Sequence, residues 1–223
     1  MYKALVLKEL RETMGITILA LLAYFVGIVC LTGYKVLPFL PEPGLREIPF
    51  LGGNKYGWLM VVSAVVFAMA LGLWQTLGES IHGTWQYLLH RPMDMRKLIG
   101  VKLAVGGGLY LVVSALAILV YAAWPATPGT HASPFYWWMT VPVWKGWLLI
   151  LLCYLCTFLA GIRPGRWIGT RLMPIAAIYL LAVFISIIPD WWTMVDLGLP
   201  ALIVVCVFLV YLIFHIARTR DFS

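Results

Sequence analysis

The stretch that decides the fold is LIGVKLAVGGGLYLVVSALAILVYAAW, from Leu98 to Trp124. Lys102, close to its start, is the only charged residue in it. About 20 consecutive apolar residues are enough for an α-helix to cross the hydrocarbon core of a bilayer. Because lipid offers no hydrogen-bond partner to the backbone, such a run has to be helical. The stretch therefore predicts a transmembrane helix, with the Lys102 side chain reaching back to the headgroups.

Six apolar runs in the chain meet this length requirement. They are Ile16–Tyr34, Trp58–Leu77, Leu98–Trp124, Gly146–Ile162, Leu172–Pro189 and Leu197–Ala217. Only 11% of the 223 residues are charged, whereas a soluble domain has about 25%. The predicted fold class is an all-α, polytopic membrane protein with six transmembrane helices, in which residues 15–223 form the transmembrane domain.

The positive charges are distributed unequally between the two sides of this six-helix layout. One side receives Lys3, Lys8, Arg11, Arg91, Arg96, Lys97, Lys102, Arg163, Arg166, Arg171, Arg218 and Arg220. The other side receives Lys35, Arg46, Lys55 and Lys145. An excess of Lys and Arg marks cytoplasmic loops, so both termini are predicted to be cytoplasmic. The net charge of +7 then reflects topology and contact with lipid, and we expect no nucleic-acid partner.

Residues 1–14 are predicted to form an amphipathic helix that lies in the membrane interface. At helical spacing the apolar face carries Tyr2, Leu5, Val6, Leu10 and Met14, and the polar side carries Lys3, Lys8, Glu9, Arg11 and Glu12. The first apolar run, Ile16–Tyr34, is too long for the core of a cleavable signal peptide. We therefore expect this first transmembrane helix to be retained.

Two ridges of small residues are candidate helix-packing surfaces. Ala64, Ala68 and Gly72 recur every four residues on the second predicted span, and Gly100, Ala104 and Gly108 recur in the same way on the third. Small residues at this spacing let two membrane helices approach closely. We expect these two spans to pack tightly, with each other or with a partner subunit.

Sequence motifs for catalysis or cofactor binding are absent. The chain has no GxxxxGK[ST] phosphate-binding loop, no HExxH motif and no paired carboxylates within a span. Its four cysteines, Cys30, Cys153, Cys156 and Cys206, lie in apolar runs and are expected to be buried thiols. Ionisable groups inside the spans, which usually mark ion pathways, are essentially missing. We predict a non-catalytic chain without a metal site or a cofactor of its own.

The segment from Glu79 to Lys102 joins the second and third predicted spans on the cytoplasmic side. Residues 80–90 can form a short helix, which Pro92 ends because it lacks an N–H group and disfavours helix at the residue before it. One interpretation of this segment is a turn at the membrane interface whose Arg and Lys side chains bind anionic lipid.

Three motifs in this chain resemble those of ABC type-2 exporter permeases. Glu79, Gly83-Thr84, Leu88-Leu89, Pro92, Arg96 and Lys102 follow the order of the family's coupling-helix signature. The stretch Lys8–Glu12, KELRE, is similar to the start of the family's N-terminal interfacial helix. The stretch Arg218–Phe222, RTRDF, is similar to the ending that follows the last span. With six spans and cytoplasmic termini, the resemblance extends over essentially the whole chain.

The resemblance implies a permease subunit in the bacterial cytoplasmic (inner) membrane. Its coupling elbow at residues 79–99 would dock on separate ATP-binding-cassette ATPase subunits, which would bind ATP and Mg²⁺. The residues expected to couple the two proteins are Glu79, Gly83, Thr84, Trp85, Leu89 and Pro92. Further expected partners are a second permease copy or homologue, membrane lipids and a possible periplasmic accessory protein. The cargo would be hydrophobic or lipid-like. The chain departs from relatives that move large lipids or glycans, because residues 188–197 are too few for a pair of re-entrant helices.

Two other functions fit the same composition. The chain could be a non-transporting membrane subunit that an ATPase partner regulates, which would assemble with the ATPase but move no cargo. It could also be a membrane-embedded redox or enzyme subunit, which would show cofactor absorbance after purification.

Overall fold

The computed structural model describes residues 2–32, 50, 57–81, 95–127, 129–130, 134–163, 172–177 and 195–219. The helices are α1 (Tyr2–Leu31), α2 (Gly57–Ile81), α4 (Met95–Ala126), the 3₁₀-helix η1 (Trp137–Thr140), α5 (Val141–Ile162) and α7 (Val195–Thr219). Residues 173–177 are also helical, and the part of the chain that the structure describes contains no strand. The protein is therefore all-helical, as the sequence predicts.

Five of the described helices are long and apolar enough to cross a membrane. They cover Tyr2–Leu31, Leu59–Gly78, Met95–Ala126, Trp137–Ile162 and Pro200–Arg218. The sixth predicted span, Leu172–Pro189, lies for the most part outside the described residues. The chain is a multi-pass membrane protein by the length and composition of these helices.

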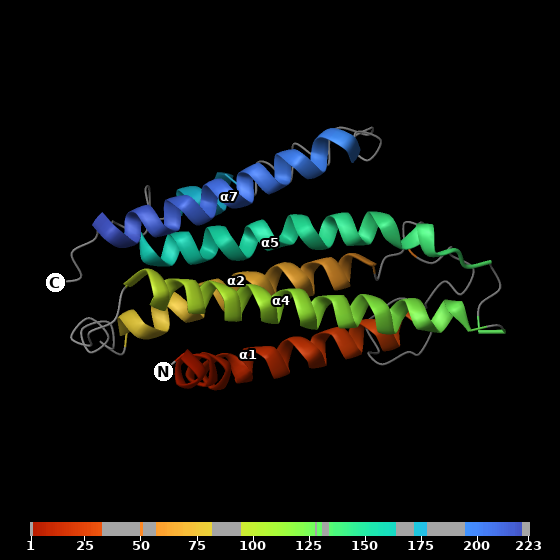
Figure 1. The fold of residues 1–223 in the computed structure, drawn as a ribbon. Helices are drawn as coiled ribbons and strands as arrows, with labels where there is room; N and C mark the ends of the chain where they lie inside the picture. Colours follow the sequence, from red (N-terminus) through yellow and green to blue (C-terminus); the bar gives the residue numbers. More distant parts are fainter. Residues whose placement is uncertain are drawn as a thin grey trace.

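The long helices form an elongated bundle (Figure 1). Helix α1 packs against α2 and α4, which both pack against α5, and α7 packs against α5 and α4. The start of α1 and the end of α7 lie at the same end of the bundle (Figure 1). Much of the outer surface is apolar: Val204, Val207 and Tyr211 on α7, for example, are each more than 60% exposed. Such a surface suits lipid, because hydrocarbon is as apolar as these side chains.

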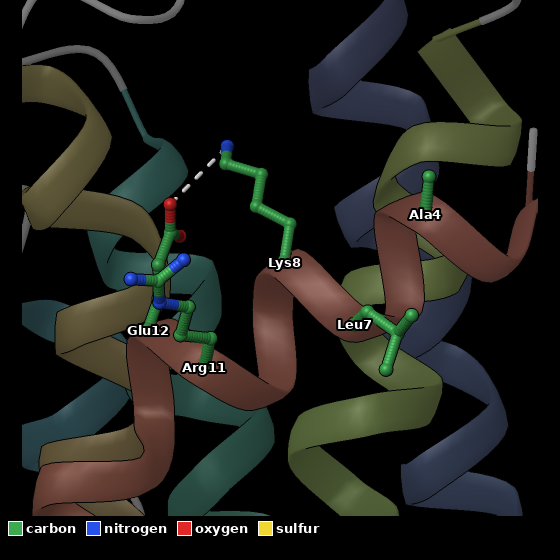
Figure 2. Close-up of a pocket in the computed structure, with 5 residues that line it drawn as sticks. All are labelled: Ala4, Leu7, Lys8, Arg11 and Glu12. Carbon is green, nitrogen blue, oxygen red and sulfur yellow. Dashed lines mark ion pairs between the residues drawn. The ribbon is translucent and has the colours of Figure 1, made fainter.

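Helix α1 continues without a break from Tyr2 to Leu31 but changes direction. Its first turns run across the neighbouring helices (Figure 2), and the rest runs along the bundle (Figure 1). Two threonines near the bend return their hydroxyls to the preceding turn: Thr13 Oγ1 donates to the Glu9 carbonyl at 2.8 Å, and Thr17 Oγ1 to the Thr13 carbonyl at 2.9 Å. Such bonds bend helices. Residues 2–14 and the described part of the first predicted span are thus one helix with two directions, and the interfacial position of the first part remains a prediction.

The predicted small-residue ridge of α2 packs against α5. Ala68 is fully buried, and a Cβ on Gly72 would lie 2.8 Å from the Tyr154 carbonyl oxygen and 2.9 Å from the Phe158 backbone nitrogen. Because both atoms belong to the backbone of α5, neither can move aside cheaply. The sequence predicted a close approach of this ridge to a helix, with the third span or a partner subunit as candidates. The helix that takes this place is α5.

The second ridge, on α4, has a different environment. Ala104 is exposed, and no atom of the described chain lies within 4 Å of a Cβ built on Gly108. A Cβ built on Gly100 would lie 3.9 Å from Phe214 Cζ on α7, its one close neighbour among the described residues. Neither glycine of this ridge is in tight contact with another of the described helices.

Candidate functional site

A buried ion pair joins the first part of α1 to α4. Lys102 Nζ lies 2.7 Å from Glu9 Oε1, and both residues are 1% exposed. Removing two charges from water is costly, so a buried charge needs an opposite charge and good hydrogen-bond geometry. The pair thus fixes the first turns of α1 against the bundle. Leu5 and Leu98, which pack together one turn earlier on each helix, extend the same contact.

Gln75 ties α2 to α4 at the same level. Its Nε2 donates to the Lys102 carbonyl at 3.1 Å, and Lys102 Nζ donates to the Gln75 carbonyl at 3.4 Å. The two helices therefore exchange hydrogen bonds in both directions. Gln75 is also buried, so its side-chain amide and its backbone carbonyl bond to protein groups and not to water.

Tyr154 adds α5 to the same network. Its hydroxyl donates to Gln75 Oε1 at 2.9 Å and lies 3.4 Å from the Lys102 carbonyl oxygen. The ring is fully buried. We call Glu9, Gln75, Lys102 and Tyr154 the polar cluster. It links side chains from four helices that are distant in sequence.

Gly106 makes room for the polar cluster one turn beyond Lys102 on α4. A Cβ at this position would lie 2.8 Å from Tyr154 Cζ and would collide with Gln75 Oε1 and the Tyr154 hydroxyl. Only glycine lets both side chains approach the α4 backbone this closely. The triple glycine at residues 106–108 thus has one member with a defined packing role.

Two expectations from the sequence are wrong here. Lys102 does not reach back to the headgroups, because its ammonium group is buried against Glu9. Glu9 does not belong to the outward polar side of residues 1–14, because it faces the bundle with Leu5 and Thr13. The signal was present in the spacing: Leu5, Glu9 and Thr13 recur every four residues and so share one face.

The predicted coupling residues lie at the edge of the described structure. Glu79 is in the last turns of α2, and Gly83, Thr84, Trp85, Leu89 and Pro92 lie outside the described residues. The polar cluster is nevertheless close to this segment. Gln75 is one turn of helix before Glu79, and Lys102 follows the start of α4 at Met95 by about two turns, or about 10 Å. The two helices that flank the elbow are thus joined near the elbow.

A second set of polar contacts joins α4 and α5 farther along the bundle. Trp147 Nε1 donates to Ser114 Oγ at 2.7 Å, and the Tyr110 hydroxyl donates to the Trp147 carbonyl at 2.9 Å. Ser114 Oγ in turn donates to the Tyr110 carbonyl. These contacts hold α4 and α5 in register at a distance from the polar cluster.

The cysteines and the possible metal-ligating side chains show no sign of a reactive site. All four cysteines are free thiols. Cys30 and Cys156 are buried, as expected, whereas Cys153 and Cys206 are partly exposed. Among the described residues, no group of three or more His, Cys, Asp or Glu side chains could hold a metal ion.

Comparison with protein-family models, with curated proteins and with solved structures finds no match to this chain. The polar cluster is therefore interpreted from its own geometry. It offers a buried charge pair, an amide and a hydroxyl, all engaged with one another across helices. Such a group is suited to holding helices in one arrangement and to passing a displacement of one helix to the other three.

Proposed function

We propose that this chain is the transmembrane permease subunit of an ATP-binding-cassette exporter. It would couple ATP hydrolysis, carried out with Mg²⁺ by separate ATPase subunits, to movement of a hydrophobic or lipid-like substrate. The chain itself would be non-catalytic. It would act with a second permease copy or homologue in the bacterial inner membrane, with a possible periplasmic accessory protein.

The observation that carries this proposal is the reciprocal bonding of Gln75 and Lys102 between α2 and α4. These helices lead into and out of the segment proposed to dock on the ATPase. Because they are joined beside that segment, a push on it displaces both helices together. A rigid pair of this kind is what mechanical coupling requires.

The contacts of α1 and α5 extend the same argument. Glu9 connects Lys102 to the first part of α1, and Tyr154 connects Gln75 to α5. Trp74, next to Gln75, adds a further tie to α1, since its indole Nε1 donates to the Glu12 carbonyl at 3.1 Å. A displacement that starts at the elbow would thus be transmitted through the polar cluster to α1, α2, α4 and α5.

The experiment is purification of the tagged protein from its native membrane in mild detergent, followed by an ATPase assay. We expect an ATP-binding-cassette subunit to co-purify, and Glu79→Ala and Gly83→Leu to uncouple ATP hydrolysis without loss of membrane insertion. Lys3→Ala is the matched control, because Lys3 is an exposed charged residue outside the elbow. Its ATPase activity should equal that of the wild type.

Other results point to the other functions. Assembly with an ATPase but no cargo movement after reconstitution into vesicles would indicate a regulated, non-transporting subunit. A protein that purifies alone, with cofactor absorbance, would indicate a redox or enzyme subunit. Normal coupled ATPase activity in both Glu79→Ala and Gly83→Leu would contradict the proposal that residues 79–99 couple the chain to the ATPase.

A further inference from the structure

Helices α2 and α5 meet through a reciprocal contact of two threonines and two glycines. Each helix carries one of each, four residues apart: Gly72 and Thr76 on α2, and Thr157 and Gly161 on α5. A Cβ on Gly72 would collide with Thr157 Oγ1. A Cβ on Gly161 would collide with Thr76 Oγ1 and lie 3.3 Å from Thr76 Cγ2. Each threonine therefore fills the space that a glycine of the other helix leaves, and we call these four residues the threonine–glycine contact.

The two threonine side chains are held in place by their own helices. Thr76 Oγ1 donates to the Gly72 carbonyl at 2.9 Å, and Thr157 Oγ1 donates to the Cys153 carbonyl at 2.8 Å. Both threonines are buried. A shift of α2 along α5 would move each threonine away from its glycine and against residues that have side chains. Because a packed interior has no free space for such a movement, the contact resists sliding of one helix along the other.

The threonine–glycine contact lies next to the proposed coupling segment. Thr76 is three residues before Glu79, where that segment begins, and Gly161 is the last residue but one of α5. From there α5 runs the length of the bundle (Figure 1). Its 22 residues span about 33 Å. At the far end η1 stops at Thr140 and α5 begins at Val141, so η1 moves with α5.

We propose that Thr76 and Gly161 are positioning residues for coupling, which make α2 and α5 move as one body when the ATPase displaces residues 79–99. The displacement then reaches η1, at the end of the bundle opposite the elbow. The Tyr154–Gln75 hydrogen bond joins the same two helices, but a hydrogen bond can exchange its partner, whereas the threonine–glycine contact is steric. This inference rests on the proposed exporter function, because it assigns a role in the coupling of that machine.

The experiment uses the full-length protein purified with its ATPase subunit in mild detergent. It measures the coupled ATPase activity and the midpoint of thermal unfolding of each variant. Gly161→Ala overfills the contact, whereas Thr76→Ala loosens it and should leave the protein folded. We expect both variants to lower the coupled ATPase activity about twofold to thirtyfold, the range in which residues of coupling networks act. Only Gly161→Ala should also lower the unfolding midpoint clearly, because its methyl group collides with Thr76.

An exchange of the two residues tests whether they act on each other directly. Thr76→Gly together with Gly161→Thr places the threonine on α5 and the glycine on α2. The double variant should recover most of the activity that each single substitution loses, since residues in contact are not additive. The matched control is Gly27→Ala. A Cβ at Gly27 would lie 2.8 Å from Met60 Sδ, so this variant overfills a contact between α1 and α2 and should keep the coupled ATPase activity of the wild type.

Three results would overturn the coupling role while the exporter function stands. One is normal coupled ATPase activity in both Thr76→Ala and Gly161→Ala. Another is a double variant that is no more active than Gly161→Thr. The third is an equal loss of activity in Gly27→Ala and Gly161→Ala, which would assign the loss to overall packing. Failure of the proposed function is seen separately, in the wild type: if no ATPase subunit co-purifies with it, the exporter proposal and this inference are both wrong.

Discussion

Lys102 Nζ lies 2.7 Å from Glu9 Oε1, although 93 residues separate them in the chain. This contact connects a helix that begins across the bundle with a helix that runs along it. Both side chains are almost completely buried, so each depends on the other for compensation of its charge. The pair is therefore a point at which a single substitution should have a large effect.

Lys102→Met should destabilise the protein by about 3–5 kcal/mol, because it leaves the Glu9 carboxylate buried without its counter-ion. The double variant Glu9→Leu with Lys102→Met removes both charges and should recover most of the loss. The measurement is the midpoint of thermal unfolding in detergent, followed by size-exclusion chromatography. Lys97→Met serves as the control and should leave the midpoint unchanged, since Lys97 is exposed. A double variant no more stable than Lys102→Met would contradict the charge argument.

Tyr154→Phe should cost about 1–3 kcal/mol, because Gln75 Oε1 loses its donor while it remains buried. The ring itself is retained, so packing of α5 should change little. Thermal unfolding of the purified protein measures the loss. Tyr136→Phe removes the same hydroxyl from a residue that is 55% exposed, and its effect should stay within about 0.5 kcal/mol. Equal effects of the two substitutions would mean that the Tyr154 hydroxyl contributes nothing specific.

Gly72→Ala should destabilise the protein by about 1–3 kcal/mol, the usual cost of overpacking, because the new methyl group would meet the backbone of α5. Gly78→Ala is the control in the same helix, because a Cβ at Gly78 would meet no other described element within 4 Å. There the higher helix propensity of alanine should stabilise by up to about 1 kcal/mol. Opposite signs of the two shifts in unfolding midpoint are the expected result. A stabilised Gly72→Ala would show that α2 and α5 lie farther apart than described.

The helices themselves follow from hydropathy. The run Leu98–Trp124 predicted α4, observed from Met95 to Ala126, and the run Gly146–Ile162 predicted α5, which begins five residues earlier at Val141. A run of apolar residues is a local property, and lipid forces it to be helical. The remaining small differences are at helix ends, where hydropathy changes gradually.

The polar cluster could not be predicted in this way. Hydropathy assigns Glu9 and Lys102 separately to polar positions near helix ends, and nothing local indicates that they meet. The burial of Glu9 depends on the bend of α1, and the approach of Gln75 and Tyr154 depends on the space left by Gly106. Both are properties of the packed bundle. The sequence also could not determine which helix packs against the small-residue ridge of α2, because Gly72 allows close approach of any helix.

If the chain assembles as proposed, Gly108→Leu should disrupt that assembly while leaving the single chain folded. A Cβ at Gly108 has no neighbour within 4 Å in the described chain, so the start of a larger side chain has space among the described residues. With Ala104, which is exposed, Gly108 forms a small-residue surface that would let a second subunit approach α4 closely. A leucine there would hold the two helices apart.

The measurement is the oligomeric state in detergent, by native gel or by light scattering after size-exclusion chromatography. Gly146→Leu provides the comparison, because Gly146 on α5 is equally free of neighbours within 4 Å and lies outside the ridge. We expect Gly108→Leu to shift the protein to the smaller species and Gly146→Leu to leave the distribution as in the wild type. If both variants keep the oligomeric state of the wild type, the ridge of Gly108 and Ala104 is not a contact between subunits.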